Sequence, residues 1–80
     1  MSEHYLYLIL PTSEMHELVS DMRRQGYNVE TTGLGYVCHE TTRHGLVLVL
    51  SALKGTSGRY RVKANLAFFE TGAQRSEACH

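Results

Sequence analysis

The feature that most constrains this chain is an aliphatic stretch near its middle, Leu-Val-Leu-Val-Leu-Ser-Ala-Leu at residues 46–53. In an extended strand, successive side chains point to opposite faces of the sheet. One face of this predicted strand therefore carries Leu46, Leu48, Leu50 and Ala52, and the other carries Val47, Val49, Ser51 and Leu53. Residues 5–10, Tyr-Leu-Tyr-Leu-Ile-Leu, are also apolar on both faces. A sheet built on two such strands needs apolar cover on both sides.

A single amphipathic helix is predicted to provide this cover on one side. Its apolar residues recur at the i, i+3, i+4 and i+7 spacing of one helix face and are Met15, Leu18, Val19 and Met22. Thr12 or Ser13 can cap the first turn. Gly26 is the residue type that best adopts the left-handed conformation just past a helix end. We therefore expect a helix over residues 13–25.

Glycines divide the rest of the chain into predicted strands. Residues 27–39 alternate around Gly33-Leu34-Gly35, which indicates one bent strand with a bulge or a close backbone approach. The remaining predicted elements are a hairpin connection at 40–45, a third strand from His44 or Leu46 to Leu53, a turn at 55–58 and a fourth strand at 59–70.

The element order β-α-β-β-β predicts an α+β fold in one compact domain over residues 1–70, followed by a flexible C-terminal tail over residues 71–80. A helix that joins the first two strands demands a right-handed crossover, whereas strands two to four can run as an antiparallel meander. We therefore expect a four-stranded mixed or antiparallel sheet with the helix on one face.

Composition narrows the classes of function. Eight basic and eight acidic residues cancel among 80, which argues against a histone-like DNA coater and against an acidic mimic of DNA. No apolar run approaches the ~20 residues that span a bilayer, and the start of the chain lacks the basic region of a secretory signal. Two cysteines, Cys38 and Cys79, are too few for the disulfide framework of a secreted domain. We expect a cytoplasmic protein that does not contact membranes.

One helix covers only one side of the predicted sheet, so apolar residues on the other side are candidate partner contacts. These are Tyr5, Tyr7, Ile9, Val47, Val49 and Leu53. We expect another chain to cover them, either a second copy packing sheet on sheet, with a dimer favoured, or a protein target. The alternative is that strands one and three are central and that the tail or segment 33–45 covers this face.

Two charged stripes are candidate orienting contacts. The fourth strand places Arg59, Arg61 and Lys63 on one face, where they can contact phosphates or an acidic protein surface. The helix carries an acidic stripe of Glu14, Glu17 and Asp21. Ordinary solvation of a sheet edge and of a helix is the alternative explanation for both stripes. Tyr60 and Phe68 fall on the side of the strand opposite the basic stripe, so nucleic acid is possible as a partner but unsupported.

The remaining reactive residues do not form a recognisable chemical site. Adjacent Cys38 and His39 point to opposite faces of a strand, and their spacing to His44 matches no closed zinc site. No group is identifiable that would orient a histidine toward Cys38 for catalysis. Gly33-Leu34-Gly35 is followed by a strand instead of the helix N-terminus that binds phosphates. We expect no enzymatic activity, no metal and no cofactor.

Residues 5–36, with an apolar strand, a helix, the exit Gly26-Tyr27-Asn28-Val29 and Gly33-Leu34-Gly35, resemble the first half of PII-type signalling proteins and other ferredoxin-like regulators. That resemblance implies a trimer with nucleotide or small ligands at subunit clefts. The family's second helix and final strand have no counterpart here, because the turn at 55–58 stands where that helix would begin. No ligand residue is transferred from it.

The expected function is that of a non-enzymatic protein-interaction module. Short, neutral, cysteine-poor chains without catalytic motifs are common among phage and mobile-element proteins that block a host machine, including anti-CRISPR inhibitors. We therefore expect a small inhibitor or regulator that occludes a partner, self-associating or docking through the apolar sheet face. The alternative is a regulatory module that binds nucleic acid or a small ligand through the basic stripe.

Overall fold

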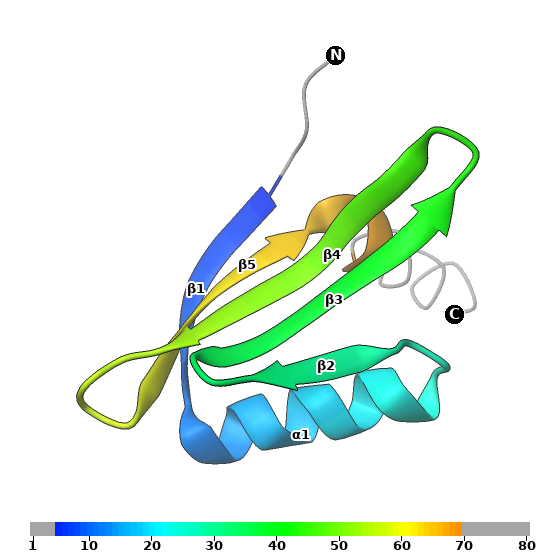
Figure 1. Cartoon of the computed structure of the whole chain (residues 1–80). Coiled ribbons are helices and arrows are strands. Elements are labelled where there is room, and N and C mark those ends of the chain that lie inside the picture. Colours follow the sequence, from blue (N-terminus) through cyan, green and yellow to red (C-terminus); the bar gives the residue numbers. More distant parts are fainter. Residues whose placement is uncertain (1–4, 70–80) are drawn as a thin grey trace, which may run out of the picture.

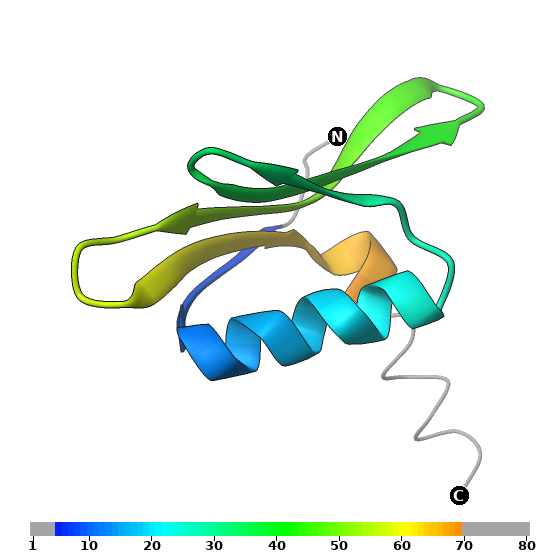
Figure 2. The same ribbon diagram turned by 60° about the horizontal axis from the view of Figure 1, so that its bottom comes forward.

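The computed structural model describes residues 5–69, so the predicted tail over 71–80 and Cys79 lie outside the described residues. A five-stranded sheet forms one layer and a helix the other (Figures 1 and 2). In chain order the elements are β1 (Tyr5–Pro11), α1 (Thr12–Arg24), β2 (Val29–Thr32), β3 (Gly35–Thr42), β4 (Gly45–Lys54) and β5 (Arg59–Asn65). A short helical turn follows at 66–69. Between residues 5 and 69, no helix is long and apolar enough to cross a membrane.

The predicted α+β class is confirmed, but the sheet has one strand more than predicted. The strand order is β1-β5-β4-β3-β2, and every pairing is antiparallel. The antiparallel option is therefore the right one, since the strands between residues 5 and 69 form no parallel pair. β1 and β2 lie at opposite edges, so α1 connects the two edges across one face (Figure 1).

The extra strand arises at the glycines in the predicted bent strand 27–39. The chain turns back at Gly33-Leu34, and the Thr32 Oγ1 atom accepts hydrogen bonds from the backbone N–H of Leu34 at 3.1 Å and of Gly35 at 2.9 Å. A Cβ atom on Gly35, whose φ is +154°, would lie 2.0 Å from the carbonyl oxygen of Ala52. The expected close backbone approach is present, but at a hairpin instead of within one strand.

The helix ends as the sequence predicts and begins differently. Gly26 has φ +102°, its N–H donates to the Arg23 carbonyl at 3.1 Å, and the next N–H, of Tyr27, donates to the Met22 carbonyl at 3.0 Å. These two bonds form a Schellman motif, which confirms the predicted role of Gly26. The predicted cap is wrong, because Pro11 occupies the N-cap position and Thr12 is already helical. The hydroxyl of Thr12 donates instead to the carbonyl of Gly58, at 2.7 Å.

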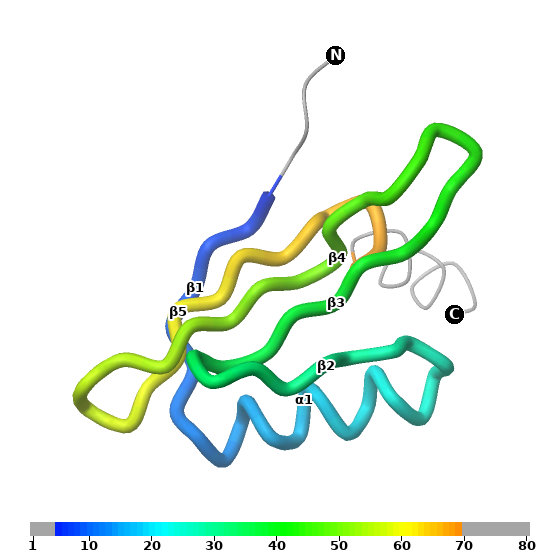
Figure 3. Tube along the Cα trace, viewed as in Figure 1, coloured from blue at the N-terminus to red at the C-terminus, as the bar shows by residue number. Residues whose placement is uncertain are grey.

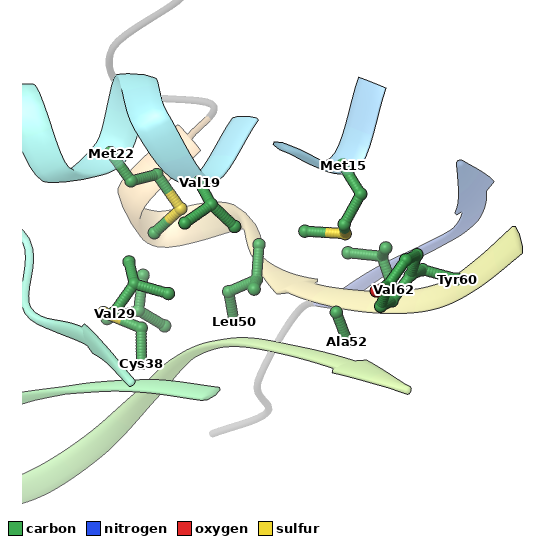
Figure 4. Packing of buried hydrophobic residues seen from close by; sticks show 10 residues of the cluster. Met15, Val19, Met22, Val29, Cys38, Leu50, Ala52, Tyr60 and Val62 are labelled. Carbon is green, nitrogen blue, oxygen red and sulfur yellow. The ribbon is translucent and has the colours of Figure 1, made fainter. Parts of the chain in front are cut away.

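The core fills the space between α1 and the sheet (Figure 4). Three helix residues, Met15, Val19 and Met22, are at most 3% exposed. They pack over residues from four strands, namely Val29, Cys38, Val49, Leu50, Ala52, Tyr60 and Val62. This cluster fixes which side of each strand faces the helix.

A β-bulge in β4 changes the predicted faces of the central strand. Cys38 pairs with Leu50 but His39 pairs with Leu48, so Val49 is the extra residue and the alternation reverses beyond it. Val49 is 0% exposed and belongs to the core. Its predicted place on the uncovered face is therefore wrong.

The same reversal changes the predicted faces of the β4 residues that lie between Val49 and the β3–β4 turn. Val47 pairs with Glu40, two residues from the inward-facing Cys38, so Val47 falls on the helix side of the sheet. Leu46 and Leu48 move to the other side. The hairpin that carries them projects beyond the other strands (Figure 3).

Asn65 is the last residue of β5 and contacts β4 beside the bulge. Its side chain is 6% exposed, and its Nδ2 atom donates to the carbonyl oxygen of Leu48 at 2.9 Å. Its Oδ1 atom accepts from the backbone N–H of Ala67 at 3.0 Å, where the helical turn begins. The predicted strand 59–70 consequently ends at Asn65.

Candidate functional site

The face of the sheet that points away from α1, here called the open face, combines apolar and basic side chains in two rows. Because residues paired across strands share a face, the register places Tyr7, Lys63 and Ser51 in one row. The adjacent row contains Ile9, Arg61 and Leu53. Cations on β5 therefore lie between apolar side chains of β1 and β4.

The apolar members of these rows are accessible. Tyr7 is 69% exposed, Ile9 is 60% exposed and Leu53 is 44% exposed. Together with Arg61 and Lys63 they line a shallow hollow of about 490 Å³. Tyrosine and arginine are among the residue types that most often dominate the binding energy of protein interfaces, and Tyr7 and Arg61 both line this hollow.

The two guanidinium groups of the open face are available to a partner, whereas Lys63 is half-buried. The Nζ atom of Lys63 lies 4.4 Å from the centroid of the Tyr5 ring, a cation–π contact that orients both groups. Arg59 and Arg61 are exposed. Within residues 5–69 the one ion pair joins Arg24 to Asp21, so neither guanidinium on β5 is neutralised by a carboxylate of this part of the chain.

The structure joins two predicted sites that the sequence left separate. Four of the predicted apolar contacts lie on the same face as the basic stripe: Tyr5, Tyr7, Ile9 and Leu53 share it with Arg59, Arg61 and Lys63. The cause is the pairing of β1 with β5, which no local pattern specifies. Tyr60 lies on the opposite face, as predicted, and is 6% exposed. The tyrosines beside the cations come instead from β1, and of these Tyr7 is exposed and Tyr5 is half-buried.

The acidic stripe of Glu14, Glu17 and Asp21 lies on α1 and therefore on the other side of the sheet from the basic stripe. All three residues are exposed. The two charged stripes cannot contact the same flat partner surface, because the sheet separates them.

Cys38 is buried in the core beneath α1. Burial raises the pKa of its thiol, and the charges of Glu40 and Glu30 raise it further. A thiol with a raised pKa stays protonated near neutral pH and is a poor nucleophile. His39 is exposed and, as the neighbour of the inward-facing Cys38, lies on the opposite face. Among residues 5–69 no three His, Cys, Asp or Glu side chains gather in a metal-binding arrangement.

Comparisons of the chain with protein-family models, curated proteins and solved structures give no significant match.

Proposed function

We propose that this protein is a non-enzymatic interaction module, a small inhibitor or regulator, that docks its open face on a partner protein and occludes the surface it covers. The partner surface carries carboxylates along its centre and apolar side chains on both sides of them. The observation that carries the proposal is the exposure of Tyr7, Ile9 and Leu53 on both sides of Arg61 and Lys63. Apolar contacts would supply affinity, and the cations would set orientation and speed of association.

The size of the chain is compatible with this role. A stable interface takes about 800 Å² from each partner. The accessible surface of the protein is 5782 Å², so such an interface uses roughly one seventh of it. An inhibitor of the anti-CRISPR kind, encoded by a phage or a mobile element, would use a single face in this way.

A different protein fits the open face better than a second copy of this chain. In a symmetric face-to-face dimer the same patch meets itself. Arg59, Arg61 and Lys63 would then be brought against their own equivalents, and juxtaposed like charges disfavour association. The partner we propose therefore carries carboxylates.

Single-stranded nucleic acid is the second candidate. It is favoured by Tyr5 and Tyr7, which lie beside the basic stripe, because bases stack on aromatic rings while cations contact phosphates. The exposed aliphatic side chains of Ile9 and Leu53 and the zero net charge of the chain favour a protein partner instead.

The test compares Arg61→Glu with Arg43→Glu, an identical charge change in the β3–β4 turn. Immobilised wild-type protein and both variants are exposed to the same native lysate, and retained proteins are quantified by mass spectrometry. We expect a protein that wild type and Arg43→Glu retain and Arg61→Glu loses. Equal retention by all three would contradict the proposal.

Fluorescence anisotropy with a labelled oligothymidine distinguishes the second candidate. Saturable binding that weakens with salt and with Tyr7→Ala would replace the protein partner with nucleic acid. No binding at low salt would remove that candidate.

A further inference from the structure

A second surface lies on the helix side of the sheet, in a groove between α1 and the β1–β5 margin. Its volume is about 500 Å³, within the roughly 300–1,000 Å³ typical of binding clefts. The floor is apolar and includes Leu8, Leu10 and Val62, and Leu18 of α1 forms part of a wall. Three carboxylates, Glu14, Glu17 and Asp21, also line the groove.

The groove exists because one helix cannot cover the whole face. α1 has 13 residues, which makes it about 20 Å long and about 10 Å wide. It must reach from the β1 edge to the β2 edge of a five-stranded sheet, so it leaves part of the β1–β5 margin without a helix above it. Leu6, which pairs with the inward-facing Ala64, is 45% exposed although it lies on the helix side.

The wall formed by α1 is negatively charged. Glu14, Glu17 and Asp21 are spaced by three and four residues and therefore follow one helix face. Asp21 pairs with Arg24. Neither Glu14 nor Glu17 makes an ion pair with another residue of the range 5–69.

We propose that this groove binds a basic amphipathic helix of a partner protein. An apolar stripe at i, i+3, i+4 and i+7 would cover the floor beside Leu8, Leu10 and Val62, as in other helix-in-groove complexes. Lysines or arginines beside that stripe would meet Glu14 and Glu17. A helix at the usual ~8–10 Å from α1 would complete the helical layer of the fold. The site is independent of the open face, which lies on the other side of the sheet and carries the opposite charge.

Two other occupants match the groove less well. Residues 70–80 follow Phe69, which lines the groove, but their sequence Glu-Thr-Gly-Ala-Gln-Arg-Ser-Glu-Ala-Cys-His contains no Leu, Ile, Val or Phe to fill an apolar floor. The helix of a second copy would bring its own Glu14, Glu17 and Asp21 against the same carboxylates.

The test uses the full chain and a fluorescein-labelled synthetic helix as the probe, with leucines at i, i+3, i+4 and i+7 and lysines at the flanking positions. One control peptide has the same composition with the leucines spread around the helix, and another has glutamate in place of lysine. Anisotropy titrations should give saturable binding of the probe and at least about tenfold weaker binding of both controls. Equal binding of the probe and the scrambled peptide would overturn the proposal.

Charge reversals then locate the bound probe. Glu17→Lys should weaken probe binding by about fivefold, and Glu30→Lys, the same change on the exposed edge strand β2, by less than about twofold. Arg61→Glu on the open face should leave it unchanged, which separates this site from the proposed function. Equal effects of the two glutamate variants would overturn the proposal. So would displacement of the probe by a synthetic copy of residues 70–80, or its exclusion by dimers detected in light scattering.

Discussion

The two sides of the sheet carry their charges on different elements, a central strand on one side and the helix on the other. On the open face, Arg61 and Lys63 lie on β5, which is paired on both sides, so the hydrogen-bonded ladders to β1 and β4 set their position relative to the apolar residues of those strands. On the helix side, Glu14 and Glu17 belong to α1, which is held to the sheet by side-chain packing. The cations can shift relative to the apolar residues beside them only if strands separate, whereas the carboxylates can shift with the helix as a whole. The proposed open-face site therefore suits a partner of fixed shape, and the proposed groove site suits a ligand to which α1 can adjust.

The largest effect is expected where the sheet itself is broken, because both surfaces then disappear together. Gly35→Ala places a Cβ atom 2.0 Å from the carbonyl oxygen of Ala52 and should lower the free energy of unfolding by about 3 kcal/mol. Gly33→Ala, where nothing lies within 4 Å of the new atom, is the matched control. Urea unfolding curves measure both variants, and equal midpoints would show that the β3–β4 approach is looser than described.

The next test asks which side of the sheet each residue of β4 faces. Val49→Ala removes two methyl groups from a fully buried position and should cost about 2 kcal/mol. Leu46→Ala, at a side chain that is 70% exposed, should stay within about 0.5 kcal/mol of wild type. Calorimetric melting of the two variants measures both losses of stability. A larger loss for Leu46→Ala than for Val49→Ala would show that the bulge is absent.

Asn65→Ala tests how the bulge is held beside the open face. It removes the donor to the Leu48 carbonyl and the acceptor of the Ala67 N–H, and should cost about 1–2 kcal/mol because those groups are left without partners. Asn65→Asp keeps the acceptor and loses the donor. If the stability of Asn65→Asp lies between those of wild type and Asn65→Ala, both hydrogen bonds contribute to the stability. If Asn65→Ala is as stable as wild type, neither bond contributes.

The smallest effect concerns the buried thiol on the helix side. The raised pKa of Cys38 means that the folded state holds the thiol proton more tightly than the unfolded state. In the unfolded state the thiol has its ordinary pKa of 9.0. The stability advantage of wild type over Cys38→Ala is therefore complete below pH 9.0 and should shrink as pH rises above it through the folded pKa. Paired denaturation series at increasing pH measure this difference. A constant difference would show that the thiol is not desolvated.

Local sequence patterns predicted most of the helix and strands but did not predict which strands pair with one another. The spacing of Met15, Val19 and Met22 with Gly26 at the end placed the helix within one residue of its observed bounds. The alternation of β1 and β5 assigned their faces correctly because neither strand contains an irregularity. The hairpin at Gly33-Leu34 was missed because two short strands around a tight turn have the same periodicity as one bent strand.

The candidate site was less predictable because it depends on long-range pairing. Tyr7 and Lys63 are far apart in the chain and meet through the β1–β5 ladder, for which the sequence contains no local signal. The bulge at Val49 could not be predicted for another reason. Leu48, Val49 and Leu50 are all apolar, so a one-residue shift leaves the hydrophobic pattern of the strand unchanged.

The insertion of β5 between β1 and β4 has a consequence for synthesis on the ribosome. β1 is made before β5, which is its one ladder partner among the strands of residues 5–69 and which ends at Asn65. Until then the Leu-Tyr-Leu-Ile-Leu edge remains unpaired in the nascent chain. The β1–β5 ladder therefore forms only after Asn65 has been made, and translation that stalls before this residue would leave an apolar strand without its partner.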